Sequence, residues 1–266
     1  MLSRFPQNLR QSVGVSVVAL LCVMAVGVLQ VPQLDYLKHK AKTASPAQLK
    51  REVAAEQVRL DLLQKLPAFG FDNLLANWIL LDFIKYFGDD EVRAVTGYRL
   101  SPEYFEVIVD RDPRFLDIYY FLPTAVSIYA AMPEKSVALI AKGLKSLTPK
   151  VPPGSYYVWR QKGIDELLFL GDAGSARQSF EKAAEWASVY DDEESKRVAI
   201  ISRQNAEFLA RNPKSKNAQV SAWTMVLTNA VDLRSRQIAI SRIQALGGKV
   251  IITPEGKLAV QPPKED

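Results

Sequence analysis

The sequence predicts an all-α protein that one N-terminal helix holds to a membrane. A run of nineteen residues without a charge, residues 13–31, lies close to the N-terminus. Segments with apolar residues at helical spacing then follow one another between residues 45 and 247, separated by short turns that contain Pro or Gly. No strand-like segment separates these helices, which argues against an alternating α/β chain.

The composition is that of an ordinary globular protein. Of 266 residues, 48% are hydrophobic and 24% are charged. The net charge of +5 is unevenly distributed, because residues 1–51 and 196–249 are basic and residues 52–195 are acidic. This asymmetry favours an acidic partner or an anionic surface over general binding of nucleic acid. One cysteine, Cys22, excludes an internal disulfide, and one histidine, His39, excludes most zinc sites.

The apolar run at residues 13–31 predicts a transmembrane helix. At about 1.5 Å per residue it spans about 28 Å, close to the hydrocarbon thickness of a bilayer. The alternatives are a cleaved signal peptide, for which Ala25-Val26-Gly27 supplies small residues, and a lipoprotein signal at Cys22. We rank the uncleaved anchor first, because the run continues past the small residues and large leucines precede the cysteine.

Basic residues flank the predicted anchor. Residues 1–12 form a short N-terminal tail, and residues 32–44 form a linker that contains Lys38, Lys40 and Lys42. Since cytoplasmic flanks carry an excess of Lys and Arg, this pattern favours a large domain on the cytoplasmic side. We expect this lysine collar (Lys38, Lys40 and Lys42) to contact anionic lipid headgroups, with a solvated flank as the alternative.

Capping residues, prolines and apolar spacing place the helices of the domain at residues 45–247. Ser45-Pro46, for example, is typical of a helix start. The predicted helices cover residues 45–66, 71–87, 101–109, 112–129, 134–147, 156–170, 175–189, 196–211, 218–229 and 233–246. Residues 248–266 complete the chain as a short β-hairpin, with strands at 250–253 and 257–260, and a charged tail.

Residues 156–190 contain the clearest internal repeat. Trp159 and Gly163 lie four residues apart on the first helix, and the second helix carries Ala176, Phe180 and Ala183. Small residues let the neighbouring helix approach, and large ones fill the gap. The pattern resembles the tetratricopeptide repeat, with one extra residue in the turn and no terminal proline.

A weaker copy of the same pattern precedes this repeat. Phe121 and Ala125 stand at its Trp and Gly positions, and Val137, Ala141 and Leu144 lie on its second helix. Antiparallel helix pairs of this kind bury their apolar stripes against one another, and one pair alone cannot do so. We therefore expect the pairs to stack.

The stretches at residues 69–78 and 111–115 are also similar to a group of bacterial, including cyanobacterial, membrane-anchored tetratricopeptide-like proteins. The resemblance covers about residues 45–245. It implies a tetratricopeptide-like α–α superhelix and a scaffold or adaptor role for a protein partner, for example in assembly of a membrane complex. Fold alone does not fix function.

The resemblance also implies a binding groove. In tetratricopeptide-like arrays the first helices line a concave surface, and residues beside the Trp position point into it. The residues at these positions are Tyr119, Tyr129, Tyr157, Arg160 and Gln161. Aromatic side chains together with an arginine can hold an extended peptide or a helix. The alternative is that the tyrosines are half-buried core residues.

Two further polar features are candidate binding sites that also have simpler structural explanations. Asn73 and Asn77 lie four apart on an otherwise apolar helix, and we expect them to be buried and bonded to a neighbouring loop. The C-terminal third is basic, which fits either an acidic partner or solvated helix faces. Its basic residues are Arg203, Arg211, Lys214, Lys216, Arg234, Arg236 and Arg242.

No motif of a catalytic site is present in the sequence. It lacks the phosphate loop G-x-x-x-x-G-K-[ST] and the dinucleotide motif G-x-G-x-x-G. The acidic clusters at residues 89–91 and 191–194 lack the ligand spacing of a calcium loop. We therefore expect no enzymatic activity, no cofactor and no metal. The alternatives are a hydrolase that uses groove carboxylates and, less favoured, a basic surface that binds nucleic acid.

Overall fold

The computed structural model describes residues 15–32, 44–211, 216–252 and 258–263. The chain divides into two compact units, Met1–Ser45 and Pro46–Asp266. The lysine collar (Lys38, Lys40 and Lys42), His39 and the turn predicted at residues 254–256 lie outside the described residues.

The first unit contains one apolar helix, Val15–Pro32. It has a mean hydropathy of 2.4, and none of it is buried. Its length and composition are sufficient to cross a membrane, and a signal sequence near an N-terminus meets the same criterion. The predicted apolar helix is therefore confirmed.

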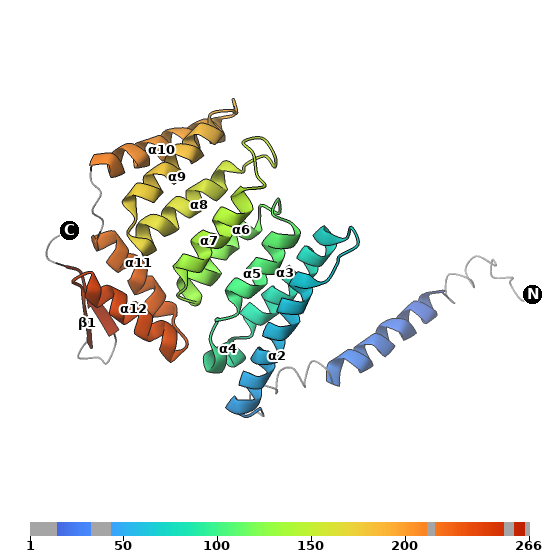
Figure 1. Cartoon of the computed structure of the whole chain (residues 1–266). Coiled ribbons are helices and arrows are strands. Elements are labelled where there is room, and N and C mark those ends of the chain that lie inside the picture. Colours follow the sequence, from blue (N-terminus) through green and yellow to red (C-terminus); the bar gives the residue numbers. More distant parts are fainter. Residues whose placement is uncertain (1–14, 33–43, 212–215, 253–257, 264–266) are drawn as a thin grey trace, which may run out of the picture. The chain divides into compact units, whose positions relative to one another are not determined.

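The second unit is helical from Pro46 to Ala245, as predicted (Figure 1). Its α-helices are α2 (Pro46–Lys65), α3 (Asp72–Gly88), α4 (Asp90–Thr96), α5 (Ser101–Arg111), α6 (Ile118–Pro123), α7 (Pro133–Leu144), α8 (Tyr156–Asp165), α9 (Ala173–Ala187), α10 (Glu193–Arg211), α11 (Lys216–Asn229) and α12 (Leu233–Ala245). Two π-helical segments, η1 (Thr124–Tyr129) and η2 (Glu166–Leu170), continue α6 and α8 without a break.

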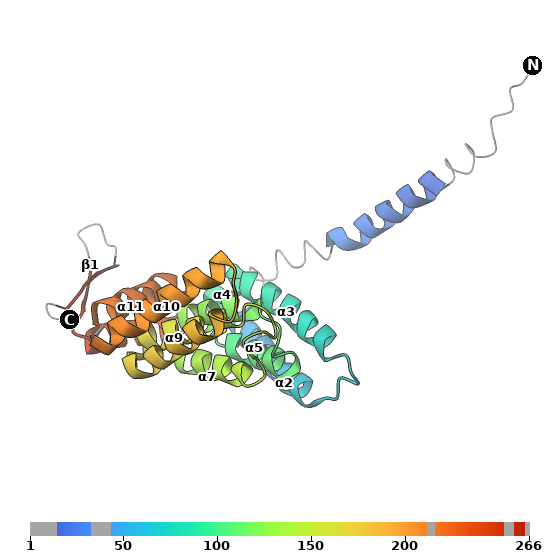
Figure 2. The same cartoon turned by 90° about the horizontal axis from the view of Figure 1, so that it is seen from above.

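Helices α5 to α10 lie side by side in sequence order (Figure 1 and Figure 2). The last two helices do not extend this row beyond α10. Instead, α11 packs against η1 and η2, and α12 packs against α11. The predicted hairpin follows, with β1 (Lys249–Ile252) antiparallel to β2 (Leu258–Gln261) and Val250 opposite Val260.

The helix pair α8–α9 packs as the repeat pattern predicts. Ala176, Phe180 and Ala183 are buried. A Cβ atom on Gly163 would lie 3.3 Å from both the Ala176 carbonyl oxygen and the Phe180 ring. The glycine thus lets the two helix backbones approach closely, and the phenylalanine fills the space beside it.

The weaker copy of the repeat was placed in the wrong register. Phe121, which was assigned to the large buried position, is 58% exposed. Tyr119 is buried instead, and its ring lies against Gly143 of α7. The hydroxyl of Tyr119 donates a hydrogen bond of 2.7 Å to the Pro113 carbonyl. Tyr119 and Gly143 therefore form the close contact between the two helices of this copy, which the sequence pattern places at Phe121 and Ala125 on the first helix and Val137, Ala141 and Leu144 on the second.

Two helix boundaries also differ from the prediction. The helix expected from Asp112 begins at Ile118, because the Asp112 carboxylate accepts a hydrogen bond from the Arg114 backbone N–H and holds a turn there. Helix α4 was missed. Asp89 was interpreted as the end of a helix, but its side chain caps α4 by accepting from the Val92 N–H at 3.3 Å.

We predict that Gly143→Ala lowers the free energy of unfolding by about 1–3 kcal/mol. The new Cβ would lie 1.8 Å from the Tyr119 hydroxyl oxygen, far closer than a carbon and an oxygen atom in van der Waals contact. Gly88→Ala is the matched control, because a Cβ there meets nothing within 4 Å. Urea unfolding of the detergent-solubilised chain measures both, and equal stabilities of the two variants would contradict the assigned contact.

Candidate functional site

A groove of about 460 Å³ opens where the α6–η1, α8–η2 and α11 segments meet. Its lining is mainly apolar. Three apolar side chains of the lining are at least partly exposed to solvent, although each belongs to a helical segment that packs on the core. They are Ile128, Leu168 and Met225. The lining residues are Pro123, Thr124, Ile128, Gln161, Ile164, Asp165, Leu168, Phe169, Ala218, Ser221, Ala222 and Met225.

Both π-helical segments lie beside this groove. A π turn contains one residue more than an α turn, which re-aims the following side chains and is frequent at functional sites. The wide turns are closed by hydrogen bonds from the Ala130 N–H to the Ala125 carbonyl, at 3.1 Å, and from the Gly171 N–H to the Glu166 carbonyl. Pro123, which precedes η1, has no N–H to donate to the regular helical ladder.

A buried carboxyl group lies at the same junction. Asp165 is 1% exposed, and its Oδ2 accepts hydrogen bonds of 2.6 Å from the hydroxyls of Ser127 and Ser136. These bonds connect the end of α8 to η1 and α7. Burial raises the pKa of Asp165 to about 6, while the two hydroxyls lower it and the charge of Glu166 raises it further.

Glu166, which follows Asp165 in the sequence, directs its carboxylate to helix α9. Glu166 is buried and forms an ion pair with Lys162, while Ser179 of α9 donates a 2.6 Å hydrogen bond to its second oxygen. The two adjacent acids therefore connect α8–η2 to η1 and α7 on one side and to α9 on the other. Each is hydrogen-bonded within the fold, as buried polar groups must be.

The structure brings three of the five predicted groove residues together. Tyr119, Tyr157 and Gln161 line a shallow hollow between α6 and α8, with no interior space for a water molecule. Tyr119 is buried core, as the alternative interpretation had it, so its assignment to a binding surface is wrong. Tyr157 is partly exposed and donates a hydrogen bond to Glu194.

The other two predicted residues do not complete one surface. The Arg160 guanidinium lies 6.0 Å from the centre of the Tyr157 ring, beside the hollow. Tyr129 lies elsewhere, packed edge-on against Phe87 and Tyr98 at centroid distances of 4.9 and 5.0 Å. Gln161 lines both the hollow and the larger groove. It is therefore the one predicted residue of the five that the larger groove includes.

The two other polar candidates also have structural explanations. Asn73 and Asn77 are exposed, and Asn77 donates to the Asn73 carbonyl of its own helix at 2.8 Å, so the expectation of burial against a loop is wrong. In the basic C-terminal third, Arg242 pairs with Glu134 at 2.6 Å and Arg234 donates to the Ala130 carbonyl at 3.1 Å. Arg242 thus connects α12 to the start of α7, and Arg234 connects it to the end of η1.

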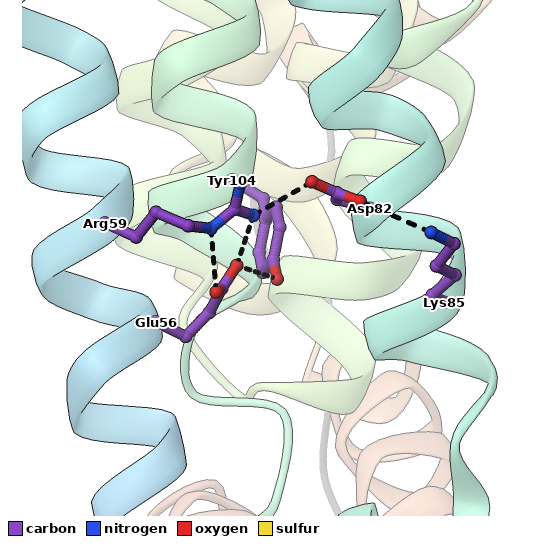
Figure 3. A network of polar contacts seen from close by, with 5 residues as sticks. All are labelled: Glu56, Arg59, Asp82, Lys85 and Tyr104. Atoms are coloured by element: carbon purple, nitrogen blue, oxygen red, sulfur yellow. Dashed lines mark hydrogen bonds and ion pairs between the residues drawn. The ribbon is translucent and has the colours of Figure 1, made fainter. Parts of the chain in front are cut away.

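A polar network ties α2 and α3 to α5 (Figure 3). Arg59 of α2 forms two hydrogen bonds with Glu56, at 2.6 and 2.9 Å, and reaches Asp82 of α3 at 3.0 Å. Tyr104 of α5 donates to Glu56 at 2.6 Å, and Lys85 lies 3.7 Å from Asp82. The side chains satisfy one another, so the network is structural.

Comparisons of the chain with protein-family models, curated proteins and solved structures gave no significant match. The resemblance to tetratricopeptide-like proteins stays a prediction from the sequence.

We predict that Asp165→Asn changes how stability depends on pH. The pKa of Asp165 is about 6 in the folded state, against the ordinary value of 3.8 for an aspartic acid, so the wild-type fold keeps a proton that the unfolded chain releases. Its free energy of unfolding therefore falls between about pH 4 and pH 6, by up to about 3 kcal/mol. The asparagine cannot titrate, so unfolding curves of the variant should lack this decline.

Asp172→Asn is the control variant, because the pH dependence that Asp172 gives to stability has the opposite sign to that of Asp165. The Ser175 backbone N–H lowers the pKa of Asp172, which caps α9, so its contribution is present above the unfolded pKa and is lost as the pH falls. As the pH rises, the free energy of unfolding of the wild type should increase relative to that of Asp172→Asn. Over the same range it should decrease relative to that of Asp165→Asn. A constant difference between the wild type and Asp165→Asn would show that the carboxyl group does not titrate in this range.

Proposed function

We propose that this chain is a membrane-tethered helical-repeat adaptor that binds an apolar segment of a protein partner. The observation that carries the proposal is the groove between η1, η2 and α11, which leaves Ile128, Leu168 and Met225 accessible. Concave, mainly apolar surfaces with a few polar groups are typical binding sites. An amphipathic partner helix places side chains into such a groove at intervals of three or four residues.

The tether and the repeat are part of the same proposal. We propose that residues 13–31 anchor the chain, with lipid contacts from the lysine collar and the large domain on the cytoplasmic side. The close packing of Gly163 against α9 supports a tetratricopeptide-like arrangement of the helix pairs. A scaffold in assembly of a membrane complex fits both features, and it requires no catalysis, cofactor or metal.

A hydrolase remains the second candidate, because Asp165 lines the groove and has a raised pKa. Two observations favour the adaptor. Both serine hydroxyls donate to one oxygen of this carboxyl group and connect three helical segments. Among the described residues that line the groove, Asp165 is the only acid, so the paired carboxylates of a glycosidase are not supplied there.

The groove can be tested by photo-crosslinking in native membranes. A photoreactive amino acid in place of Ile128 should capture the partner, and one in place of the exposed Lys182 on α9 should not. Met225→Asp should reduce capture from position 128 by about tenfold or more, because it places a charge in an apolar contact. Capture that is equal at both positions, or unaffected by Met225→Asp, would refute the groove.

Arg160→Glu is the companion variant in this experiment. Arg160 lies beside the tyrosine hollow and not in the lining of the larger groove. We expect it to leave capture from position 128 unchanged. If Arg160→Glu abolishes capture while Met225→Asp does not, the partner binds at the tyrosines.

The tether has its own test. We expect the chain to stay in the membrane pellet after extraction with carbonate at high pH and to keep its N-terminal residues in an intact-mass measurement. A mature chain that begins beyond residue 25 and is released by carbonate would establish a signal peptide instead. Protease added from the cytoplasmic side should digest the domain at residues 45–247, and protection would reverse the proposed orientation.

A further inference from the structure

Helix α3 has one face that the chain does not cover, and this face is mainly apolar although it also exposes Asn73, Asn77 and Lys85. Its inner side is buried on the core through Ala76, Ile79, Phe83 and Tyr86. The outer face carries large apolar side chains that, with those of the preceding loop, are between 55% and 85% exposed. They are Phe69, Phe71, Leu74, Trp78, Leu81 and Ile84. Large apolar side chains exposed together in this way indicate an interaction surface.

The loop before α3 extends the same face. Phe69 has a backbone φ of 51° and Gly70 a φ of 88°, and the Phe71 N–H donates to the Ala68 carbonyl at 2.8 Å. A bulky residue with a left-handed backbone is rare, because its Cβ crowds the following carbonyl. This tight turn leaves the Phe69 ring 85% exposed at the end of the helix.

The acids near this face are neutralised within the fold. Asp82 and Glu56 bind Arg59, as Figure 3 shows, and Asp72 pairs with Arg111 at 3.0 Å. Arg111 also donates to backbone carbonyls at the end of α2, which fixes the loop between α2 and α3. The face is therefore mainly apolar, its nearby acids are paired, and the loop that precedes it is held in place.

The exposed charged side chains of α2 and α3 are mainly basic, and Lys85, four residues after Leu81, lies on the outer face of α3 itself. Lys50, Arg51 and Lys65 of α2 are exposed, against one exposed acid of α2 and α3, Asp61. Helix α10, at the other end of the row, exposes Ile200, Ile201 and Phe208, fewer large apolar side chains than α3 and its preceding loop, and Glu207 lies next to Phe208. Aromatic and aliphatic side chains bordered by Lys and Arg are characteristic of helices that lie in the membrane interface.

We infer that the outer face of α3, together with Phe69 and Phe71, lies in the headgroup region of the lipid bilayer. The inference rests on the proposed membrane tether. Residues 33–45 separate the apolar helix Val15–Pro32 from α2, and thirteen residues reach at most about 45 Å. Such a linker keeps the face at a high local concentration near the lipid. A weak apolar and electrostatic attraction is then sufficient for the face to bind the bilayer.

Depth-dependent fluorescence quenching tests the inference on the full chain. Cys22→Ser removes the one native cysteine, and Leu74→Cys or Lys182→Cys then carries an environment-sensitive fluorophore. The chain is reconstituted in vesicles of phosphatidylcholine and phosphatidylglycerol with brominated acyl chains. We expect brominated lipid to quench the probe at position 74 by about twofold and the probe at position 182 hardly at all.

Matched variants separate lipid contact from a general effect. With the probe at position 74, Leu81→Glu should abolish quenching, because it places a charge in the proposed lipid contact. Phe208→Glu changes a residue of similar exposure on α10 and should leave quenching unchanged. Both sites are exposed, so circular dichroism should show intact folding. Equal responses of the two variants would overturn the inference.

A probe on the native Cys22 reports the tether independently. Quenching at position 22 without quenching at position 74 overturns this inference and leaves the tether in place. Absence of quenching at position 22 overturns the tether itself. If the probe at position 74 shows energy transfer between copies and no quenching by brominated lipid, a second copy of the chain covers α3 and the lipid inference is wrong.

Discussion

The hydrogen bonds to Asp165 are the interaction on which the centre of the helical unit depends. One carboxyl oxygen accepts from Ser127 and Ser136, which lie on η1 and α7, two segments that precede it in sequence. Loss of the acceptor would leave two buried hydroxyls unpaired, and loss of either hydroxyl would leave a buried carboxyl group less well solvated. The interaction thus fixes α8 against its neighbours at the point where the binding groove begins.

The π-helical segments explain why a groove forms at this place. Each adds a residue to a helix that must still bury its apolar side on α7, so the following side chains turn toward α11. Helix α11 then packs against both segments without filling the space between them. A row of regular helix pairs would have no such gap, because its side chains would interlock along the whole contact. The groove is therefore a consequence of local irregularity within a regular stack.

Local signals made most of the helices predictable from sequence. Ser45-Pro46 and Ser101-Pro102 lie at observed helix starts, and the Gly163–Phe180 pattern correctly predicted a close helix contact. Tyr119 was misplaced because an aromatic residue fits either core or surface, and the choice depends on Gly143 in another helix. The groove was missed because its lining comes from three distant segments, each of which has ordinary apolar spacing. Contacts between such segments leave no local pattern in the sequence.

Helix α3 shows what apolar spacing does and does not establish. Its hydrophobic residues are not confined to one stripe, so a core on one side leaves several of them exposed on the other. The chain covers the side that carries Ile79 and Phe83 and leaves the side that carries Leu74 and Trp78 exposed. The apolar content of a helix reflects every environment it meets, including those that other molecules supply. If the helix Val15–Pro32 anchors the chain as proposed, lipid would be the apolar environment of both this helix and the outer face of α3.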